Sequence, residues 1–276
     1  MSELVLGTAQ WGNAYGVTNA VGRLSDEELG AIVAVANEAG VSSVDTARGY
    51  GDAEERLRPF ASQFDVTTKI SGGSDVAVQV DASLDALGLS SLGGVLLHDW
   101  DQLDCKGQGM SVLGFSALLE SDKVSRVGVS VYDATGLETA AETFDAAGVP
   151  LDEIQVPANV LDRRLDSSQL LMELFSSGSR IVVRSAFLQG VLLASGGGLA
   201  EHPDVMRFRE SVGDGNLLNA CLGHVKALPW ASHVVVGVTS AAELEQIVSV
   251  WEECSPVLVD ESCGSSDLDV IDPRRW

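Results

Sequence analysis

The sequence contains no uninterrupted apolar run of the roughly 18 residues that a membrane-spanning helix needs. Its N-terminus, M-S-E-L-V-L-G, also lacks the basic region and the cleavage pattern of a signal peptide. The usual signals for membrane insertion and secretion are therefore absent. We expect a cytoplasmic protein that does not bind a membrane.

Basic residues are scarce as well. Seventeen Lys and Arg stand against 40 Asp and Glu, which gives a formal net charge of -23. A chain of this charge repels nucleic acid phosphates and anionic lipid headgroups. We therefore exclude nucleic acid and membrane surfaces as partners, whereas the charge says little about the fold.

Cysteines are few, and their spacing is not typical of a metal or redox motif. Cys105, Cys221, Cys254 and Cys263 form no C-x-x-C pair and have no companion histidines at ligand spacing. We predict reduced, structural thiols and no metal site. A redox-sensitive pair late in the chain is the alternative. The sequence carries no signal for the oligomeric state.

Strand patterns alternate with helical patterns along the chain. Eight strands are predicted, at Leu4–Thr8, Val41–Ala47, Val66–Ile70, Val95–His98, Arg126–Val131, Ile154–Ala158, Ile181–Ala186 and Val234–Val238. Such alternation indicates a parallel sheet with helices outside it. Eight units without a domain break favour one α/β domain over residues 1–276, a (β/α)8 TIM barrel with a C-terminal tail at 265–276. An open doubly wound sheet is the alternative, although no G-x-G-x-x-G follows the first strand.

Local signals also indicate where helices begin and end. Ser25 to Glu28 has the form of a capping box, and Ser240 to Glu243 repeats that form before the last predicted helix. We further predict a short helix over Glu54–Ser62 and a long helical region that ends near Leu228.

Titratable side chains end three consecutive predicted strands. These are Asp45, Lys69 and His98, and Tyr50 lies in the turn D-T-A-R-G-Y-G that follows Asp45. Active sites of such barrels lie at the carboxyl ends of the strands, and neighbouring strands are about 4.8 Å apart. We therefore expect these four side chains to converge on one cavity.

The four groups together suggest carbonyl chemistry. We expect the Lys69 ammonium to favour the Tyr50 phenolate and lower its pKa, and Asp45 to keep Lys69 charged. His98 can donate a hydrogen bond to a substrate oxygen. These groups can polarise and protonate a carbonyl but provide no electrons, so we expect a bound nicotinamide as hydride donor. Each residue alone could have a purely structural role, but a cluster of titratable residues at strand ends favours a functional site.

Eight motifs in order resemble the aldo-keto reductases: G-T-A-Q, D-T-A-R-G-Y-G, T-K-I, L-L-H, G-V-S, Q-V-P-A-N, R-S-A-F-L-Q-G and G-V-T-S-A-A-E-L. The resemblance runs from about Leu4 to Trp251. It implies a (β/α)8 barrel that uses NADPH, or less often NADH, to interconvert carbonyls and alcohols. It also implies that Tyr50 is the general acid, Lys69 its pKa modulator, Asp45 the partner of Lys69 and His98 the orienter of the carbonyl.

The resemblance also implies a set of cofactor-binding residues for NADP(H) or NAD(H). They are Gly7, Thr8, Ala9, Asp45, Ser130, Gln155, Arg184, Ser185, Ala186, Phe187, Gln189, Gly190, Gly237, Val238, Thr239, Ser240, Glu243 and Gln246. Ser130 and Gln155 match residues that hold the nicotinamide carboxamide, and Ser185 to Gly190 would line the pyrophosphate. Ser195–Gly198 would be a mobile flap over it. For a small-molecule carbonyl substrate, the expected contacts are Trp11, Tyr50 and His98, although Trp11 and Tyr15 could equally pack beneath the first loop.

The chain departs from the family pattern at several cofactor positions. Val131 stands where asparagine is frequent, and Arg184 stands where many members stack a tyrosine on the nicotinamide. A guanidinium plane can stack there too. Gly237 and Glu243 replace the lysine and arginine that many NADPH-using members place at the 2′-phosphate. The hypothesis is that NADPH preference is weak or reversed, with Glu243 as a simple capping residue the alternative.

Two other functions stay open at the level of sequence. One is a regulatory dinucleotide-binding protein that keeps the barrel and the cofactor but has lost useful turnover. The other is a Schiff-base aldolase with Lys69 as nucleophile, which the neighbouring Asp45 disfavours because it would keep the amine protonated. The tail ends in P-R-R-W, which could fold back on the barrel or remain loose.

Overall fold

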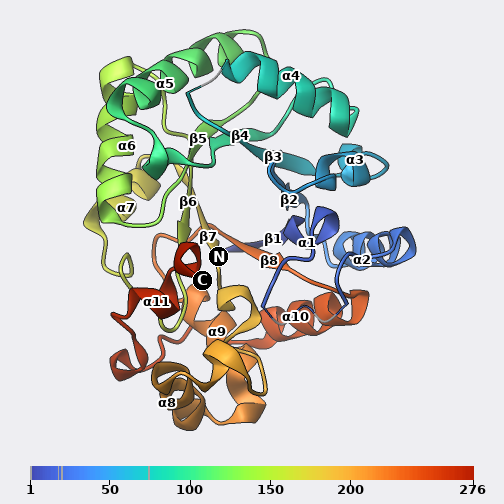
Figure 1. Cartoon of the computed structure of the whole chain (residues 1–276), viewed down its shortest axis with the longest axis vertical. Helices are drawn as coiled ribbons and strands as arrows, with labels where there is room; N and C mark the ends of the chain where they lie inside the picture. Colours follow the sequence, from blue (N-terminus) through green and yellow to red (C-terminus); the bar gives the residue numbers. More distant parts are fainter. Residues whose placement is uncertain (1, 18, 20, 74) are drawn as a thin grey trace.

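The chain folds into a closed barrel in this computed structural model, which describes residues 2–17, 19, 21–73 and 75–276. Eight parallel strands follow one another in chain order, and the first pairs with the last to close the ring (Figure 1). They are β1 (Glu3–Gly7), β2 (Ser43–Asp45), β3 (Asp65–Ile70), β4 (Gly94–Leu97), β5 (Val127–Ser130), β6 (Glu153–Pro157), β7 (Arg180–Arg184) and β8 (His233–Gly237). The predicted (β/α)8 barrel is confirmed.

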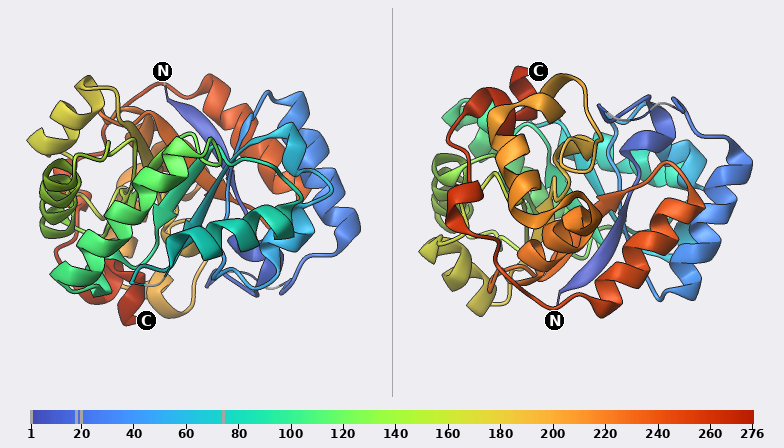
Figure 2. Two further views of the ribbon diagram at one scale, coloured as in Figure 1. Left: turned by 90° about the horizontal axis from the view of Figure 1, so that it is seen from above. Right: turned by 90° about the horizontal axis from the view of Figure 1, so that it is seen from below.

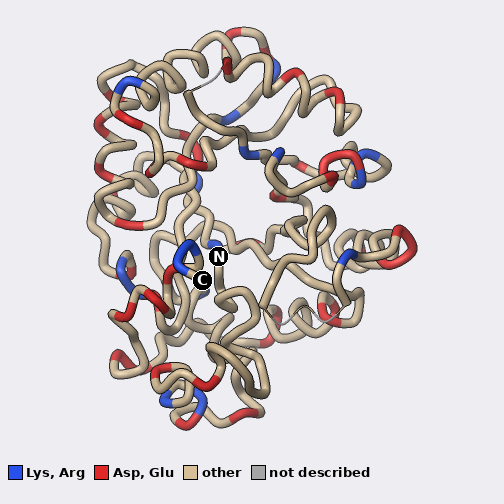
Figure 3. The backbone as a smooth tube through the Cα atoms, in the orientation of Figure 1, with Lys and Arg blue, Asp and Glu red and all other residues tan. Residues whose placement is uncertain are grey.

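Helices surround the ring of strands (Figure 2). They are α1 (Ala9–Gly12), α2 (Asp26–Glu38), α3 (Ala53–Leu57), α4 (Val76–Leu87), α5 (Cys105–Glu120), α6 (Ala134–Ala147), α7 (Gln169–Ser176), α8 (Pro203–Val212), α9 (Leu217–Lys226), α10 (Ala241–Glu253) and α11 (Leu268–Ile271). Within the described ranges, none is long and apolar enough to cross a bilayer. Acidic residues are spread over these outer elements (Figure 3).

Two predicted helices are shorter than expected. The helix predicted over Glu54–Ser62 is helical only over α3, because Pro59 has no N–H for the next helical hydrogen bond. A separate 3-10 turn, η1 (Ala61–Gln63), follows it. The long helical region before Leu228 is divided into α8 and α9. Gly213 ends α8 with a φ of 79°, a backbone conformation that favours glycine.

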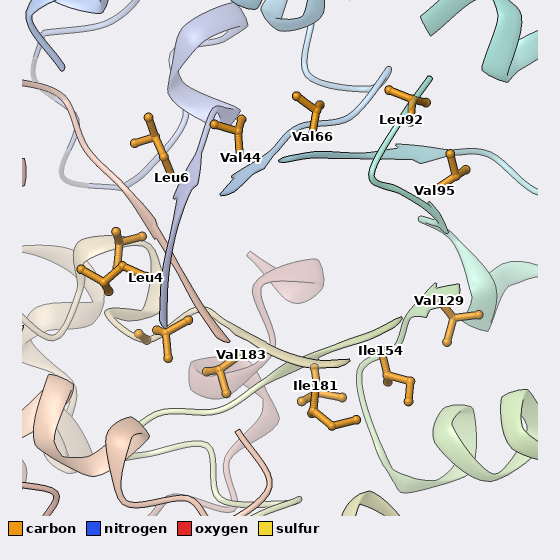
Figure 4. Close-up of a cluster of buried hydrophobic side chains, with 14 of the residues drawn as sticks. Leu4, Leu6, Val44, Val66, Leu92, Val95, Val129, Ile154, Ile181 and Val183 are labelled. Atoms are coloured by element: carbon orange, nitrogen blue, oxygen red, sulfur yellow. The ribbon is translucent and has the colours of Figure 1, made fainter. Parts of the chain in front are cut away.

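The main apolar core lies between the strands and the helices around them. Figure 4 shows its side chains on successive strands around the barrel. In strand β6, successive side chains point alternately outward to the helices and inward to the barrel. Ile154 and Val156 join the apolar cluster, whereas Glu153 accepts a hydrogen bond from Thr67 of β3 and Gln155 donates one to Asp45 of β2. Polar groups are thereby directed into the barrel, where they can build a site.

A second apolar cluster joins α8 and α9 to the C-terminal tail. Phe208 of α8, Cys221 of α9 and Val270 and Ile271 of α11 are all buried in it. The tail therefore folds back onto the barrel, which decides between the two alternatives left by the sequence. The short 3-10 turn η7 (Pro273–Arg275) then follows α11.

A charged cluster fills the amino end of the barrel. Glu153 is 1% exposed and accepts from Arg126 Nε at 3.0 Å, while Arg180 Nε lies 3.7 Å away. Asp65 Oδ2 pairs with the same two arginines at 2.7 and 2.9 Å. Burial raises the pKa of Glu153, and the two guanidinium groups offset only part of that effect. The cluster satisfies buried charges that would otherwise destabilise the fold.

We expect Glu153→Ala to lower the free energy of unfolding by about 3 kcal/mol, because it leaves two partly buried guanidinium groups with Asp65 as their only carboxylate in this cluster. Urea unfolding measures the change. Glu138→Ala, which removes an exposed carboxylate on α6, is the matched control. Equal effects of the two substitutions would contradict a supporting role for Glu153.

Candidate active site

Lys69 is the central side chain of a polar cluster at the carboxyl end of the barrel. It lies on β3, is 1% exposed and donates a hydrogen bond to Asp45 Oδ1 at 2.5 Å. Asp45 is the last residue of the neighbouring strand β2. Lys69 Nζ also donates to the Tyr50 hydroxyl at 3.3 Å. Three of the four predicted side chains are therefore in direct contact.

The turn after β2 holds Tyr50 over this lysine. The Arg48 N–H donates to the Lys69 carbonyl at 3.0 Å, which ties the turn to β3. The Tyr50 N–H closes the turn on the Ala47 carbonyl, also at 3.0 Å. Helix α1 approaches this turn closely because Gly12 has no side chain. A Cβ at Gly12 would lie 1.8 Å from the Tyr50 carbonyl oxygen.

His98 is the fourth member of the cluster and follows β4 directly. Its backbone N–H donates to the Ile70 carbonyl at 2.9 Å, which extends the pairing of β3 with β4. Its ring meets the Tyr50 ring edge-on, with the centroids 5.6 Å apart. The structure thus brings all four sequence-predicted side chains together.

Burial controls the protonation of the cluster. It raises the pKa of Tyr50 above its ordinary value, and the attraction of Lys69 offsets only part of the rise. Lys69 therefore lowers the pKa of Tyr50 as expected, but burial has the larger effect and the net shift is upward. Burial by itself lowers the pKa of Lys69, but Asp45 and Tyr50 raise it by more than burial lowers it. The net pKa lies above the ordinary value, so the ammonium stays charged. Burial and then Lys69 lower the pKa of His98 to about 4, so its imidazole is neutral near pH 7.

A cavity of about 730 Å³ opens above these groups. Ligand pockets commonly have volumes of about 300 to 1,000 Å³. Most of the predicted site residues line this cavity, namely Gly7, Thr8, Ala9, Asp45, Tyr50, His98, Ser130, Gln155, Arg184, Ser185, Ala186, Phe187, Gln189, Gly190, Gly237, Thr239, Glu243 and Gln246.

Some predicted positions lie elsewhere. Trp11 is fully buried in the main core and does not line the cavity, so the expectation of a substrate contact is wrong; Tyr15 lines the cavity instead. Val238 is 1% exposed and joins the same core. Ser240 caps α10 by accepting from the Glu243 N–H at 3.2 Å. The predicted flap Ser195–Gly198 is likewise absent from the cavity wall, within the part of the chain that the structure describes.

Several residues that line the cavity were not predicted from the sequence. Gln10, Asn13, Tyr132 and Arg274 also line the cavity. Gln10 belongs to the G-T-A-Q motif, and Tyr132 follows the strand that ends at Ser130, so both had a sequence signal that was not used. Arg274 had none, because only tertiary packing brings the C-terminal tail to the cavity.

Gln155, on β6, is bonded to the polar cluster of Lys69, Asp45 and Tyr50. Its Nε2 donates to Asp45 Oδ2 at 2.7 Å, while Asp45 Oδ1 accepts from Lys69. Both carboxylate oxygens of Asp45 are therefore used, which fixes the orientation of the carboxylate that holds Lys69.

The loop after β7 has a strained backbone and unused donors. Ser185, Leu188 and Gln189 have φ values of 62°, 48° and 54°, a conformation that residues other than glycine seldom adopt. Among the described residues, the backbone N–H groups of Ala186 and Phe187 donate no hydrogen bond. Strained loops with free N–H groups are typical of anion-binding sites.

Two carboxylates occupy the N-terminus of α10. Glu243 Oε2 accepts from the Thr239 N–H at 2.6 Å, and Oε1 accepts from the Thr239 hydroxyl at 2.9 Å. Glu28 Oε1 reaches across from α2 and accepts from the Ala241 N–H at 2.7 Å. Neither glutamate therefore completes the capping box that the sequence indicated, although Ser25 and Ser240 supply the serine half of each.

The C-terminal tail forms one side of the cavity mouth. Arg274 Cζ lies 3.7 Å from the centroid of the Tyr132 ring, and Arg184 Cζ lies 4.0 Å from the same centroid. Arg274 is itself bound by Asp272 through Nε at 2.9 Å and Nη2 at 2.5 Å, and by Asp101 at 3.3 Å. The tail thus contacts the loops that follow β4 and β5.

Comparison with known sequences agrees with this geometry. The sequence model described as "Aldo/keto reductase family" matches residues 3–263. The chain belongs to the aldo/keto reductase family. Membership in this family supports the conclusion that the protein is an oxidoreductase enzyme. Residues 264–276, which include Arg274, lie outside the matched region.

Relatives of this aldo/keto reductase cover much of the chain. An aldo-keto reductase of Mycolicibacterium smegmatis is 29% identical over 203 residues, which span 70% of this chain and 67% of that protein. The holo form of the aldo-keto reductase AKR11C1 from Bacillus halodurans has a TM-score of 0.76 at 18% identity and covers 99% of this chain and 95% of its own. PA4992 from Pseudomonas aeruginosa, named for the same family, has a TM-score of 0.71 at 22% identity, with coverage of 92% and 90%. The last two likenesses support the fold alone.

We expect nuclear magnetic resonance titration of this aldo/keto reductase to give pKa values of about 4 for His98 and His233. Because both values lie below the ordinary 6.5, the folded state loses stability as the pH falls from 6.5 through about 4. His98→Asn assigns the first signal. A His98 signal that titrates near 6.5 would show that the ring is not desolvated.

Proposed function

We propose that this aldo/keto reductase reduces an aldehyde or ketone to an alcohol with NADH or NADPH. The observation that carries the proposal is the position of Lys69 Nζ, bonded to both Asp45 and Tyr50 beneath a cavity of about 730 Å³. A buried phenol beside a charged amine can give up a proton and remain stabilised afterwards.

In the proposed reaction, each side chain of the cluster has one role. Neutral His98 donates a hydrogen bond to the carbonyl oxygen and orients it. Tyr50 is protonated at neutral pH, and the rise of its pKa on burial keeps it so; it transfers its proton to that oxygen. Lys69 stabilises the resulting phenolate from 3.3 Å, and Asp45 keeps Lys69 charged. When bound, the reduced nicotinamide supplies the hydride that these residues cannot provide.

The residues of the cavity fit a dinucleotide. Gly7 and Gly237 let neighbouring side chains of the cavity wall pack against the backbone: a Cβ at Gly7 would lie 2.9 Å from Val235 Cγ1, and one at Gly237 would lie 2.5 Å from Gln10 Oε1. That oxygen is buried and accepts no hydrogen bond among the described residues. The free N–H groups of Ala186 and Phe187 suit a pyrophosphate. Ser130 and Gln155 would hold the nicotinamide carboxamide.

The ion pair of Lys69 makes the Schiff-base aldolase an unfavourable alternative. A nucleophilic amine must be neutral, whereas Asp45 raises the pKa of Lys69 further above its ordinary value. A dinucleotide-binding protein without turnover is separated from the reductase by measurement of activity.

Charge at the start of α10 favours NADH over NADPH. A helix N-terminus ordinarily attracts a phosphate, but the donors at Thr239 and Ala241 already serve the carboxylates of Glu243 and Glu28. A 2′-phosphate at this end of the cavity would meet two negative charges and no free donor at either residue.

Tyr50→Phe is expected to lower kcat for carbonyl reduction at least about 100-fold, because the general acid is lost. The Kd for NADH, followed by quenching of protein fluorescence, should stay within about threefold, which is about 0.7 kcal/mol. Tyr15→Phe is the matched control, since Tyr15 lines the same cavity and is not bonded to Lys69. An unchanged kcat in Tyr50→Phe would end the proposal, and tight NADH binding without turnover in the wild type would favour the regulatory alternative.

Titration at low salt should give a lower Kd for NADH than for NADPH. Glu243→Gln keeps an acceptor for Thr239 while it removes a charge, so the Kd for NADPH should fall several-fold relative to that for NADH. Glu28→Gln should act in the same direction. Glu245→Gln, an exposed neighbour on α10, should leave the ratio unchanged. A wild-type Kd for NADPH about tenfold below that for NADH would refute the preference.

A further inference from the structure

Arg184 is a positive charge in the cavity that no carboxylate of the described chain neutralises. It is the last residue of β7 and lines the cavity together with Tyr50 and His98. Salt bridges join the other cations of the site to acids, Lys69 to Asp45 and Arg274 to Asp272. No such bridge reaches Arg184 within residues 2–17, 19, 21–73 and 75–276. Arg58, Lys106, Arg163 and Lys226 also form no salt bridge among the described residues, but none of these four lines the cavity, whereas Arg184 does.

The surroundings of Arg184 hold its guanidinium in place. Cζ lies 4.0 Å from the Tyr132 ring centroid, and Nη2 donates to the Val131 carbonyl at 3.2 Å. Tyr132 is fixed in turn, since its N–H donates to Asp101 Oδ2 at 3.2 Å and Arg274 lies on its ring. A fixed guanidinium loses little conformational entropy when it binds a ligand.

Donors of Arg184 remain available. A guanidinium has five N–H groups, and the hydrogen bonds of this one go to the Val131 carbonyl and, at 3.4 Å, to the Ser185 hydroxyl. The flat pair of N–H groups on a guanidinium matches the two oxygens of a carboxylate. The two carboxylates of this region already have cationic partners, so they repel an anion little. Asp101, whose pKa Arg184 helps to lower, pairs with Arg274 at 3.3 Å, and Asp45 pairs with Lys69.

We propose that Arg184 recognises an oxyanion on the substrate, so that the preferred substrate is an aldehyde or ketone that also carries a carboxylate. The inference rests on the proposed function and adds a substrate class to it. Tyr132 and the tail residue Arg274 act as positioning residues, because they hold the guanidinium and do not themselves bind the anion. The cofactor is the competing ligand of Arg184, either through its pyrophosphate or through the nicotinamide ring, on which the guanidinium plane could stack. The experiment separates the substrate from the cofactor.

The kinetic test compares 4-carboxybenzaldehyde with 4-formylbenzamide, which is nearly the same shape and uncharged. We expect the wild type to prefer the acid about ten- to a hundredfold in kcat/KM, the contribution of one charge-assisted hydrogen-bonded pair. Arg184→Met keeps an unbranched side chain against Tyr132 and should abolish the preference, while Arg184→Lys should restore part of it. Arg275→Met removes a neighbouring charge that is paired with Asp269 and should retain the wild-type preference.

A second measurement does not depend on turnover. Isothermal titration of benzoate and benzamide into the Tyr50→Phe protein with NADH bound should show tighter binding of benzoate, and adding Arg184→Met should remove the difference. Equal binding of the two compounds would overturn the anion site even if the wild type reduces carbonyls. A selective loss of NADH affinity in Arg184→Met, with the acid preference intact, would assign Arg184 to the cofactor and would also overturn the proposal.

Discussion

The buried ion pair between Lys69 and Asp45 is the interaction on which the site depends. A lone ammonium that is 1% exposed would lose its proton, but the carboxylate 2.5 Å away keeps it charged. That charge in turn faces the Tyr50 hydroxyl, where negative charge would develop in a proton transfer. The pair exists only because β2 and β3 are neighbours in the barrel. Gln155 then fixes the second carboxylate oxygen from β6. The same contacts therefore satisfy the buried charge and would support the proposed proton transfer.

The barrel separates its charges into two groups with different consequences. At the amino end, the carboxylates of Glu153 and Asp65 neutralise the two arginines beside them. At the carboxyl end, Lys69 is neutralised but Arg184 is not. Acidic residues of the outer elements, coloured red along the backbone in Figure 3, contribute to the net charge of -23. An anionic ligand would thus meet a local positive charge inside a negatively charged protein.

Local sequence signals predicted most elements, and they failed where distant contacts compete. Ser25 and Ser240 cap their helices as expected, but Glu28 turns to the N-terminus of α10, more than two hundred residues away. The sequence around Trp11 has no periodic pattern that distinguishes a residue of the cavity wall from a core residue. In the structure, α1 packs against α3 and Trp11 is buried in the core. The net shift of the pKa of Tyr50 depends on the fold for a related reason: Lys69 lowers this pKa as the sequence indicated, but burial raises it by more. The sequence indicates that Lys69 is a charged neighbour of Tyr50, whereas the degree of burial depends on the assembled fold.

By itself, the sequence determined the alternation of strands and helices, the barrel and the four titratable groups at its strand ends, because periodicity and strand length are local properties. Tertiary structure alone decided which carboxylate meets which cation and how far each group is removed from water. It also brought the C-terminal tail to the cavity, where Arg274 lies on Tyr132. No spacing in the chain encodes that contact, because it joins residues far apart in sequence whose meeting depends on the packing of α8, α9 and α11.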